Sequence, residues 1–244
     1  MTKRLIFWGL ALLLAHMVAA EPDYTEYARV LSAYVTDTGV DYEAWSAHKE
    51  DVAALDSFLD QLAGVNPAGL AREAQKAFYI NLYNAAMLQA VLERYPLKSV
   101  KAIGLVPFSI FKQQFIRLGE RRLSLDEVEK GILLKVFSDP RIHFAVNCAS
   151  RSCPPLRAEP FVAERLDAQL DAQARLFAAS EQAARVDFKT RRVAYSKLFK
   201  WYAEDFGVVN PAEYLNRYRE VDLPDSYQVD WLPYDWSLNA SYRP

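Results

Sequence analysis

The chain is poor in the residues that most often carry chemistry, with two cysteines and three histidines among its 244 residues. The cysteines do not follow the common spacings of zinc sites, so we expect no metal ion and no cofactor. A formal charge of −2 and the lack of a long basic run argue against a general nucleic-acid binder. The sequence also has no internal repeat, low-complexity segment or clear linker.

Apolar side chains, by contrast, are plentiful: 52% of the residues are hydrophobic and 13% are aromatic, enough for a substantial core. At this length one domain is the simplest organisation. The predicted helices outnumber the strands, and the strands come in small groups. We therefore predict an α+β fold, a single domain that is helix-rich around a small, mainly antiparallel sheet.

The first twenty residues have the features of a secretory signal. A short basic start precedes an apolar stretch from Leu5 to Leu14, and the small residues Val18–Ala20 form a cleavage site. We expect residues 1–20 to be removed, so that the mature domain spans 21–244, begins at Glu21 and is periplasmic or secreted. No later segment is apolar for long enough to span a membrane.

The strongest predicted element is a helix over residues 71–95, which contains no proline or glycine and is followed by Pro96. Its centre is apolar on nearly every face, which is typical of a buried helix. Asn81 and Asn84 lie three residues apart and therefore on one face. Buried amides need partners, so these two either hydrogen-bond neighbouring backbone, or line a polar pocket or hold a catalytic group.

The other predicted elements are shorter. Ser124 and Glu127 form a capping-box pattern that opens a helix. Apolar periodicity and turn residues predict helices at 24–35, 53–62, 124–136, 162–178 and 212–218, strands at 111–117 and 142–146, a hairpin at 184–196 and an ordered extended tail at 227–239.

Residues 139–155 hold both cysteines and one of the three histidines. A turn at Asp139–Pro140 leads into the predicted strand 142–146, in which His143 faces away from its apolar neighbours. A polar loop follows Asn147. Reactive side chains at the end of a buried strand are a common way to build a site, so we place the candidate site here.

Several motifs of the chain are distinctive. They are Phe78–Asn84, Leu123–Ile132, Asp139–Cys148 and Ser152–Pro155. With these motifs the chain resembles the domain-of-unknown-function 547 family (DUF547), from about residue 24 to 240, as an exported bacterial member. The resemblance implies no settled activity, and members of the family do not all keep both cysteines, which counts against an obligatory thiol nucleophile.

A distant kinship with papain-like or transglutaminase-like cores is an analogy of fold alone. A transglutaminase-like core usually places its cysteine at the start of a buried helix, about where Asn81 lies in this chain. Here both cysteines come later, and they follow His143, the reverse of the order in papain.

The first functional hypothesis is a cell-envelope module that binds a small molecule or peptide in a polar pocket around His143. The second is a cysteine-dependent hydrolase or acyltransferase, in which His143 is the base for Cys148 or Cys153 and Asp235 or a buried amide orients the imidazole. The residues expected to line the binding pocket are Asn81, Asn84, Arg141, Asn147, Arg151 and Ser152.

The state of the cysteines separates these hypotheses. In an oxidising compartment, the short spacing of Cys148 and Cys153 predicts a disulfide, which would remove both nucleophiles and favour the binding module. A free thiol of low pKa would favour the enzyme. In either case we expect His143 to share a pocket with Asn81 or Asn84, because the two amides and the imidazole each need a polar partner.

Overall fold

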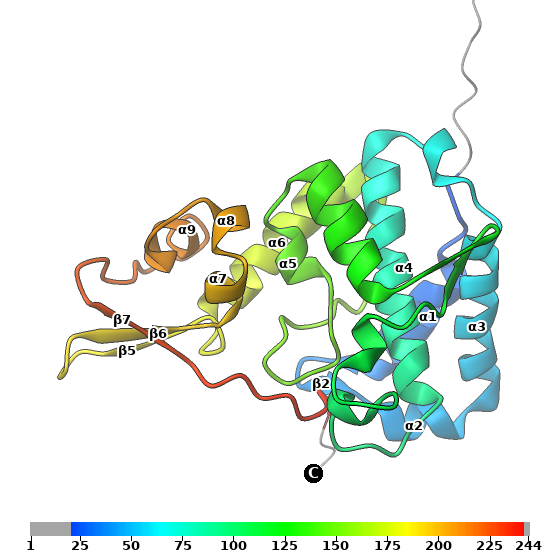
Figure 1. Ribbon diagram of the computed structural model, residues 1–244, viewed down its shortest axis with the longest axis horizontal. Coiled ribbons are helices and arrows are strands. Elements are labelled where there is room, and N and C mark those ends of the chain that lie inside the picture. Colours follow the sequence, from blue (N-terminus) through cyan, green and yellow to red (C-terminus); the bar gives the residue numbers. More distant parts are fainter. Residues whose placement is uncertain (1–20, 242–244) are drawn as a thin grey trace, which may run out of the picture.

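The computed structural model describes residues 21–241, so the predicted signal at 1–20 lies outside the described residues. Helix α4 (Arg72–Leu92) is the centre of the helical half of the molecule (Figure 1). Most of its side chains are buried, as its apolar sequence predicts. Between residues 21 and 241, no helix combines the length and the apolar character needed to cross a bilayer.

Four other helices surround α4, and α3 and η4 make its broadest contacts. The capping box that opens η4 is formed: the Ser124 amide donates to Glu127 at 2.7 Å, and the Glu127 amide donates to the Ser124 hydroxyl at 3.2 Å. Beyond this turn η4 is a π-helix. The surrounding helices are α1 (Thr25–Tyr34), α2 (Tyr42–Ala47), α3 (Lys49–Ala63) and η4 (Glu127–Phe137).

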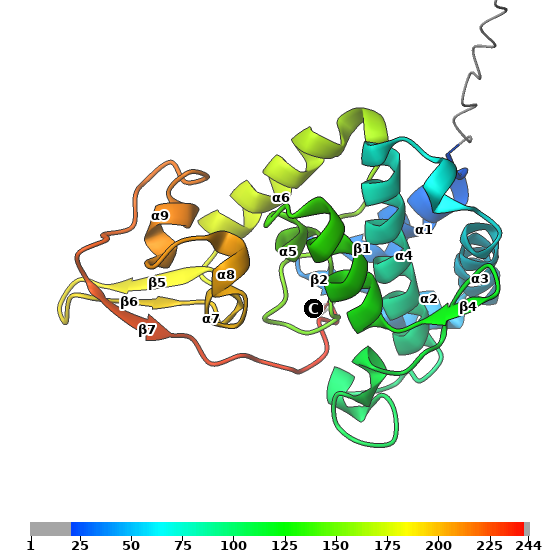
Figure 2. The same ribbon diagram turned by 45° about the horizontal axis from the view of Figure 1, so that its top comes forward.

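A smaller second half carries the largest sheet and three short helices. Helix α6 (Leu166–Ala179) runs from one half to the other (Figure 2). Its first turns, with Leu166 and Leu170, belong to the core around α4, whereas Ala174 and Phe177 belong to the second core. The short helices are α7 (Leu198–Trp201), α8 (Ala203–Phe206) and α9 (Pro211–Leu215).

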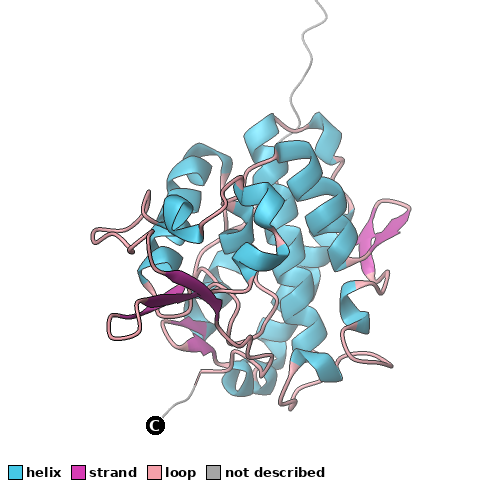
Figure 3. Ribbon diagram, turned by 60° about the vertical axis from the view of Figure 1, so that its left-hand side comes forward, coloured by secondary structure: helices cyan, strands magenta, loops and turns pink. Residues whose placement is uncertain are grey.

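The strands lie at the outside of the helices (Figure 3). The predicted hairpin is formed by β5 (Ala184–Asp187) and β6 (Arg192–Tyr195), and β7 (Gln228–Trp231) pairs with β6 in parallel. Every other strand pair is antiparallel within 21–241, so the predicted α+β class with small sheets is confirmed. The remaining elements are β1 (Val35–Thr36), β2 (Gly39–Val40), β3 (Ile116–Leu118), β4 (Arg121–Leu123), η1 (Pro67–Gly69), η2 (Val100–Ala102), η3 (Ser109–Phe111) and η5 (Ala163–Arg165).

The strand predicted at 142–146 is wrong: the segment forms the helical turn α5 (Ile142–Ala145). The side chain of Asp139 accepts the Arg141 amide at 3.1 Å, which starts a turn that continues as a helix. A short apolar run does not distinguish a buried strand from a buried helical turn. The helical spacing sends Ile142 into the core around α4 and Phe144 into the second core.

The C-terminal segment returns from β7 to the helical half, where it ends beside β2 (Figure 1). Single bridges join Ser237 to Ser99, Leu238 to Ser150, and Ala240 to Val40. The tail is therefore ordered, as predicted, and it holds the loop that follows α5.

Phe144 joins α5 to the second core, and its removal should destabilise the fold. It is 1% exposed and contacts the rings of Phe177 and Phe206. We expect Phe144→Ala to lower the free energy of unfolding by about 3 to 5 kcal/mol in denaturant titrations. Phe188 is 74% exposed, so Phe188→Ala should change it by less than about 0.5 kcal/mol. Equal losses would contradict this assignment of the core.

Candidate functional site

A cavity of about 650 Å³ lies where α4, η4, α5, α7 and the C-terminal tail meet. We call it the aromatic cavity, because seven aromatic rings face it together with a few groups that can react or titrate. Its lining consists of Tyr83, Phe108, Phe111, Lys112, Asp126, Glu129, Lys130, His143, Val146, Cys148, Cys153, Pro154, Leu198, Trp201, Tyr202, Tyr234 and Trp236.

Both cysteines belong to one loop, residues 147–154, which we call the thiol loop. The Asn147 side chain closes it: its amide nitrogen donates to the Pro154 carbonyl at 2.8 Å, and its oxygen accepts the Ala149 amide at 2.9 Å. Ala149 has a φ of 58°, an uncommon conformation for a residue other than glycine. The two hydrogen bonds of Asn147 hold the loop in this tight shape.

The buried amide of Asn84 ties the thiol loop to α4. Its nitrogen donates to the Ala145 carbonyl at 2.9 Å, and its oxygen accepts the Asn147 amide at 2.8 Å. Asn81 makes the same kind of two-point contact with Phe161, at 2.7 and 3.0 Å. Both amides are thus satisfied by backbone groups, and that of Asn84 also supports the loop that carries the thiols.

The tail holds the thiol loop from its other side. The Arg151 amide donates to the Ser237 carbonyl at 2.9 Å, and the Ser152 hydroxyl accepts the Asp235 amide at 2.8 Å. The Asp235 carboxylate accepts hydrogen bonds from Ser237. Asp235 and Ser152, predicted as a catalytic and a ligand-binding residue, are thus hydrogen-bonded to each other and join the tail to the loop.

Cys148 and Cys153 are free thiols, so the predicted disulfide is not formed in this structure. The Cys153 sulfur accepts the Cys148 amide at 2.9 Å. Burial alone would raise the pKa of Cys148, but hydrogen bonds with Cys153, Ser150 and Tyr234 outweigh it and lower the pKa to about 7. Burial raises the pKa of Cys153 well above its usual range. The two thiols therefore differ, and Cys148 is the one that ionises first.

His143 has a partner that the sequence did not predict. Its Nε2 donates to the Asp205 carboxylate at 2.8 Å, and its ring lies 4.1 Å from that of Tyr202 between centroids. Burial lowers the pKa of His143, although Asp205 opposes the shift, so the imidazole is neutral at pH 7 and Nδ1 is its basic nitrogen. The predicted pairing with Asn81 or Asn84 is not made, because those amides bind backbone groups.

Glu129 is a site residue that the sequence analysis missed. It is 8% exposed on η4 and accepts the Tyr202 hydroxyl at 3.0 Å. Burial raises the pKa of its carboxyl group, and hydrogen bonds from Tyr202 and Tyr83 only partly offset the rise. The available signal was its spacing: Glu129 is four residues before the buried Leu133, on the apolar face of the predicted helix.

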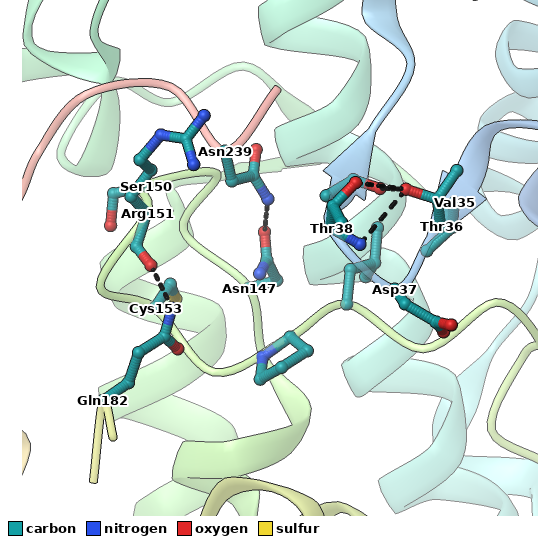
Figure 4. A pocket seen from close by; sticks show the side chains of 13 residues that line it. Val35, Thr36, Asp37, Thr38, Asn147, Ser150, Arg151, Cys153, Gln182 and Asn239 are labelled. Carbon is teal, nitrogen blue, oxygen red and sulfur yellow. Dashed lines mark hydrogen bonds between the residues drawn. The ribbon is translucent and has the colours of Figure 1, made fainter. Parts of the chain in front are cut away.

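A second, smaller hollow of about 80 Å³ lies between the thiol loop and the β1–β2 turn, and we call it the polar cleft (Figure 4). Asn147 and Arg151 line this cleft and not the aromatic cavity. Cys153 lines both the cleft and the aromatic cavity. The cleft is formed by Val35, Thr36, Asp37, Thr38, Gly39, Asn147, Ser150, Arg151, Cys153, Pro155, Leu156, Gln182 and Asn239.

Arg141, expected to line the binding pocket, binds the carboxylates of Asp139, Asp167 and Asp171 at 2.7 to 2.9 Å. These contacts, first of all that with Asp139, raise its pKa further. Arg141 lines neither the aromatic cavity nor the polar cleft. Among residues 21–241, no group of three or more histidine, cysteine or acidic side chains is placed to hold a metal ion.

Comparison with known proteins gives one match. Residues 67–178 match the model of a family described as "Protein of unknown function, DUF547". The matched segment runs from η1 through α4, η4 and the thiol loop almost to the end of α6, which supports the resemblance to this family. No curated protein and no solved structure matches the chain significantly.

The roles of the two buried asparagines can be separated by a matched pair of variants. Asn84→Ala and Asn81→Ala each leave two buried backbone groups unpaired, so each should lower the free energy of unfolding by about 2 to 4 kcal/mol. Because Asn84 supports the thiol loop, we expect alkylation of Cys148 at pH 7 to slow several-fold in Asn84→Ala and to stay unchanged in Asn81→Ala. Peptide mass mapping measures alkylation at each cysteine. An equal change in the alkylation rate of Cys148 in both variants would show that Asn84 does not position the thiol.

Proposed function

We propose that this protein is a cysteine-dependent acyl-transfer enzyme, a hydrolase or acyltransferase, with Cys148 as its nucleophile and the aromatic cavity as its active site. One observation carries the proposal: two groups in the same cavity have pKa values shifted in opposite directions. The pKa of the Cys148 thiol is lowered to about 7, and that of the Glu129 carboxyl is raised. Opposite shifts of this kind are what a nucleophilic thiolate and a proton-donating carboxyl group require.

Cys148 and Glu129 both lie near the same two tyrosines of the cavity lining. Burial is the main cause that raises the pKa values of Tyr83 and Tyr202, and both tyrosines also lie close enough to Glu129 and Cys148 to be affected by them. Each of these tyrosines therefore lies within the electrostatic reach of both groups. A substrate in the cavity would be near the thiolate and the carboxylic acid together.

In the proposed reaction, the Cys148 thiolate attacks the carbonyl carbon of an acyl compound. The bond to the leaving group breaks, and the leaving group takes the proton of Glu129. The acyl group then remains as a thioester on Cys148. Water, or another acceptor, attacks the thioester carbon and gives its proton to Nδ1 of His143 or back to Glu129. The C–S bond then breaks, which releases the acyl product and the Cys148 thiolate.

The cavity lining indicates the kind of substrate. Aromatic side chains favour an acyl compound with an apolar or aromatic part, and the volume of about 650 Å³ is in the range of small-molecule sites. Lys112 and Lys130 are the cationic residues of the lining. On the strength of the signal over residues 1–20, we place the activity outside the cytoplasm.

A second candidate is a ligand-binding module that uses the same cavity without chemistry. One observation favours it: the basic residue of the lining, His143, is bonded to Asp205 and makes no hydrogen bond with Cys148 among the described contacts. A thiol nucleophile is usually paired with its base. In a binding module, activated acyl compounds would occupy the cavity but leave Cys148 unmodified.

Acylation of the reduced protein distinguishes these candidates. We expect p-nitrophenyl esters to release a burst of p-nitrophenol and to add one acyl group to Cys148, as located by peptide mass mapping. Cys148→Ser should lose the burst, because the hydroxyl is not ionised at neutral pH, and Cys153→Ser should keep it. Ester binding without a burst or an adduct would leave only the binding module.

Glu129→Gln is the control for the acid, since it keeps the shape and loses the proton. Its effect should depend on the leaving group. With alkyl esters, which need a proton on the departing oxygen, we expect a loss of about 100-fold or more. With p-nitrophenyl esters, whose leaving group needs none, the rate should change little. A uniform loss for both kinds of ester would contradict the role of Glu129 as the acid.

A further inference from the structure

In the proposed acyl transfer Cys153 only helps to lower the pKa of Cys148 and forms no bond with the substrate, yet it lies directly beside Cys148. Its sulfur accepts the Cys148 amide at 2.9 Å and lies 3.8 Å from the Val146 carbonyl. A hydrogen bond between the two thiols helps to lower the pKa of Cys148. The Cys153 sulfur therefore lies against the backbone of Cys148, and both cysteines line the aromatic cavity.

The thiol loop holds this contact through bonds that do not involve sulfur. Asn147 joins the two ends of the loop, and the Cys153 amide donates to the Ser150 carbonyl at 3.1 Å. The tail adds a hydrogen bond from the Arg151 amide to Ser237. A bond between the sulfurs could form within this short loop without unfolding the elements that support it.

The two thiols also differ in their ionisation. In a peroxide-reducing pair, the thiol that attacks the peroxide is ionised, and the thiol that then closes the disulfide can be protonated. Cys148 contacts the hydroxyls of Ser150 and Tyr234, at 2.9 and 3.4 Å, and these stabilise its thiolate. Cys153 is 7% exposed, and its S–H faces a carbonyl oxygen, which favours the protonated form. A thiolate reacts first, and a protonated neighbour in contact with it then closes the disulfide.

We propose that Cys148 and Cys153 form a peroxide-reactive thiol pair, which reduces a small hydroperoxide in the aromatic cavity and becomes a disulfide. This activity goes beyond acyl transfer and does not depend on it. It requires the two neighbouring thiols, a proton donor for the leaving oxygen and an opening to the cavity. Oxidation would also inactivate acyl transfer, because Cys148 in a disulfide is no longer a nucleophile.

The Cys148 thiolate attacks the terminal O–H oxygen of the hydroperoxide and the O–O bond breaks. The departing alkoxide, or hydroxide in the case of hydrogen peroxide, takes the proton of Glu129 and leaves as an alcohol or as water. Cys148 is then a sulfenic acid. The Cys153 sulfur attacks it, an S–S bond forms, and the hydroxyl of the sulfenic acid leaves as water with the Cys153 proton. Two electrons pass from the thiols to the peroxide, and a small dithiol reductant returns the pair to two thiols.

The test uses the full reduced protein with hydrogen peroxide and tert-butyl hydroperoxide at pH 7. With either peroxide, we expect loss of both thiols and an internal disulfide between Cys148 and Cys153 in non-reducing peptide maps. The rate should exceed that of free cysteine roughly ten-fold, because about half of Cys148 is ionised at this pH. Dithiothreitol should restore both thiols. Oxidation no faster than that of free cysteine by both peroxides would overturn the proposal.

Two variants assign the roles. Cys153→Ser should stop at a sulfenic acid on Cys148 that dimedone traps, and Cys148→Ser should leave Cys153 no more reactive than free cysteine. If either variant fails to fold, dimedone added to the wild-type protein during the first seconds locates the sulfenic acid instead. A sulfenic acid on Cys153, or a disulfide between two molecules, would overturn the assignment. Burst kinetics of the reduced protein with p-nitrophenyl esters are scored separately, so that either activity can fail alone.

Discussion

The contact on which the site depends is the buried amide of Asn84. It binds the carbonyl of Ala145 and the amide of Asn147, where α5 ends and the thiol loop begins. Each of these buried groups would cost about 1 to 3 kcal/mol if left unpaired, so other paths for the chain are disfavoured. Because α4 is buried on most of its faces, this one side chain fixes the loop to the centre of the helical half.

The contact of Asn84 with the loop determines where the two thiols lie. The loop turns tightly around Asn147, and the tail covers its outer side, so that Cys148 lies on the cavity wall beside Ser150 and Tyr234. Across the same cavity, Glu129 is buried next to Tyr202. Hydrogen bonds favour the charged form of the thiol, whereas burial disfavours the charged form of the carboxyl. Packing of the core alone would require neither the hydrogen-bonded thiol of Cys148 nor the buried carboxyl group of Glu129.

Local patterns in the sequence predicted most helices and strands, but not which side chains contact one another in the site. The absence of proline and glycine over 71–95 was enough to predict α4, and the loop predicted as the candidate site lines the aromatic cavity through Cys148, Cys153 and Pro154. Periodicity failed at α5, where a short and largely apolar run fits a strand and a helical turn equally well. The Asp205 partner of His143 lies 62 residues away, and only the packing of α8 against α5 brings them together. Glu129 was overlooked because an acidic residue in a helix is expected to face solvent.

The central claim is that Cys148 is an ionisable thiol in an accessible cavity, and its titration tests that claim most directly. The measurement is the rate of alkylation of Cys148 in the reduced protein by iodoacetamide, from pH 5 to pH 10. Because only the thiolate reacts, the rate should rise with pH and reach half its maximum near pH 7. A midpoint at or above the ordinary thiol value of about 8.5, or no reaction at Cys148 before unfolding, would contradict the account.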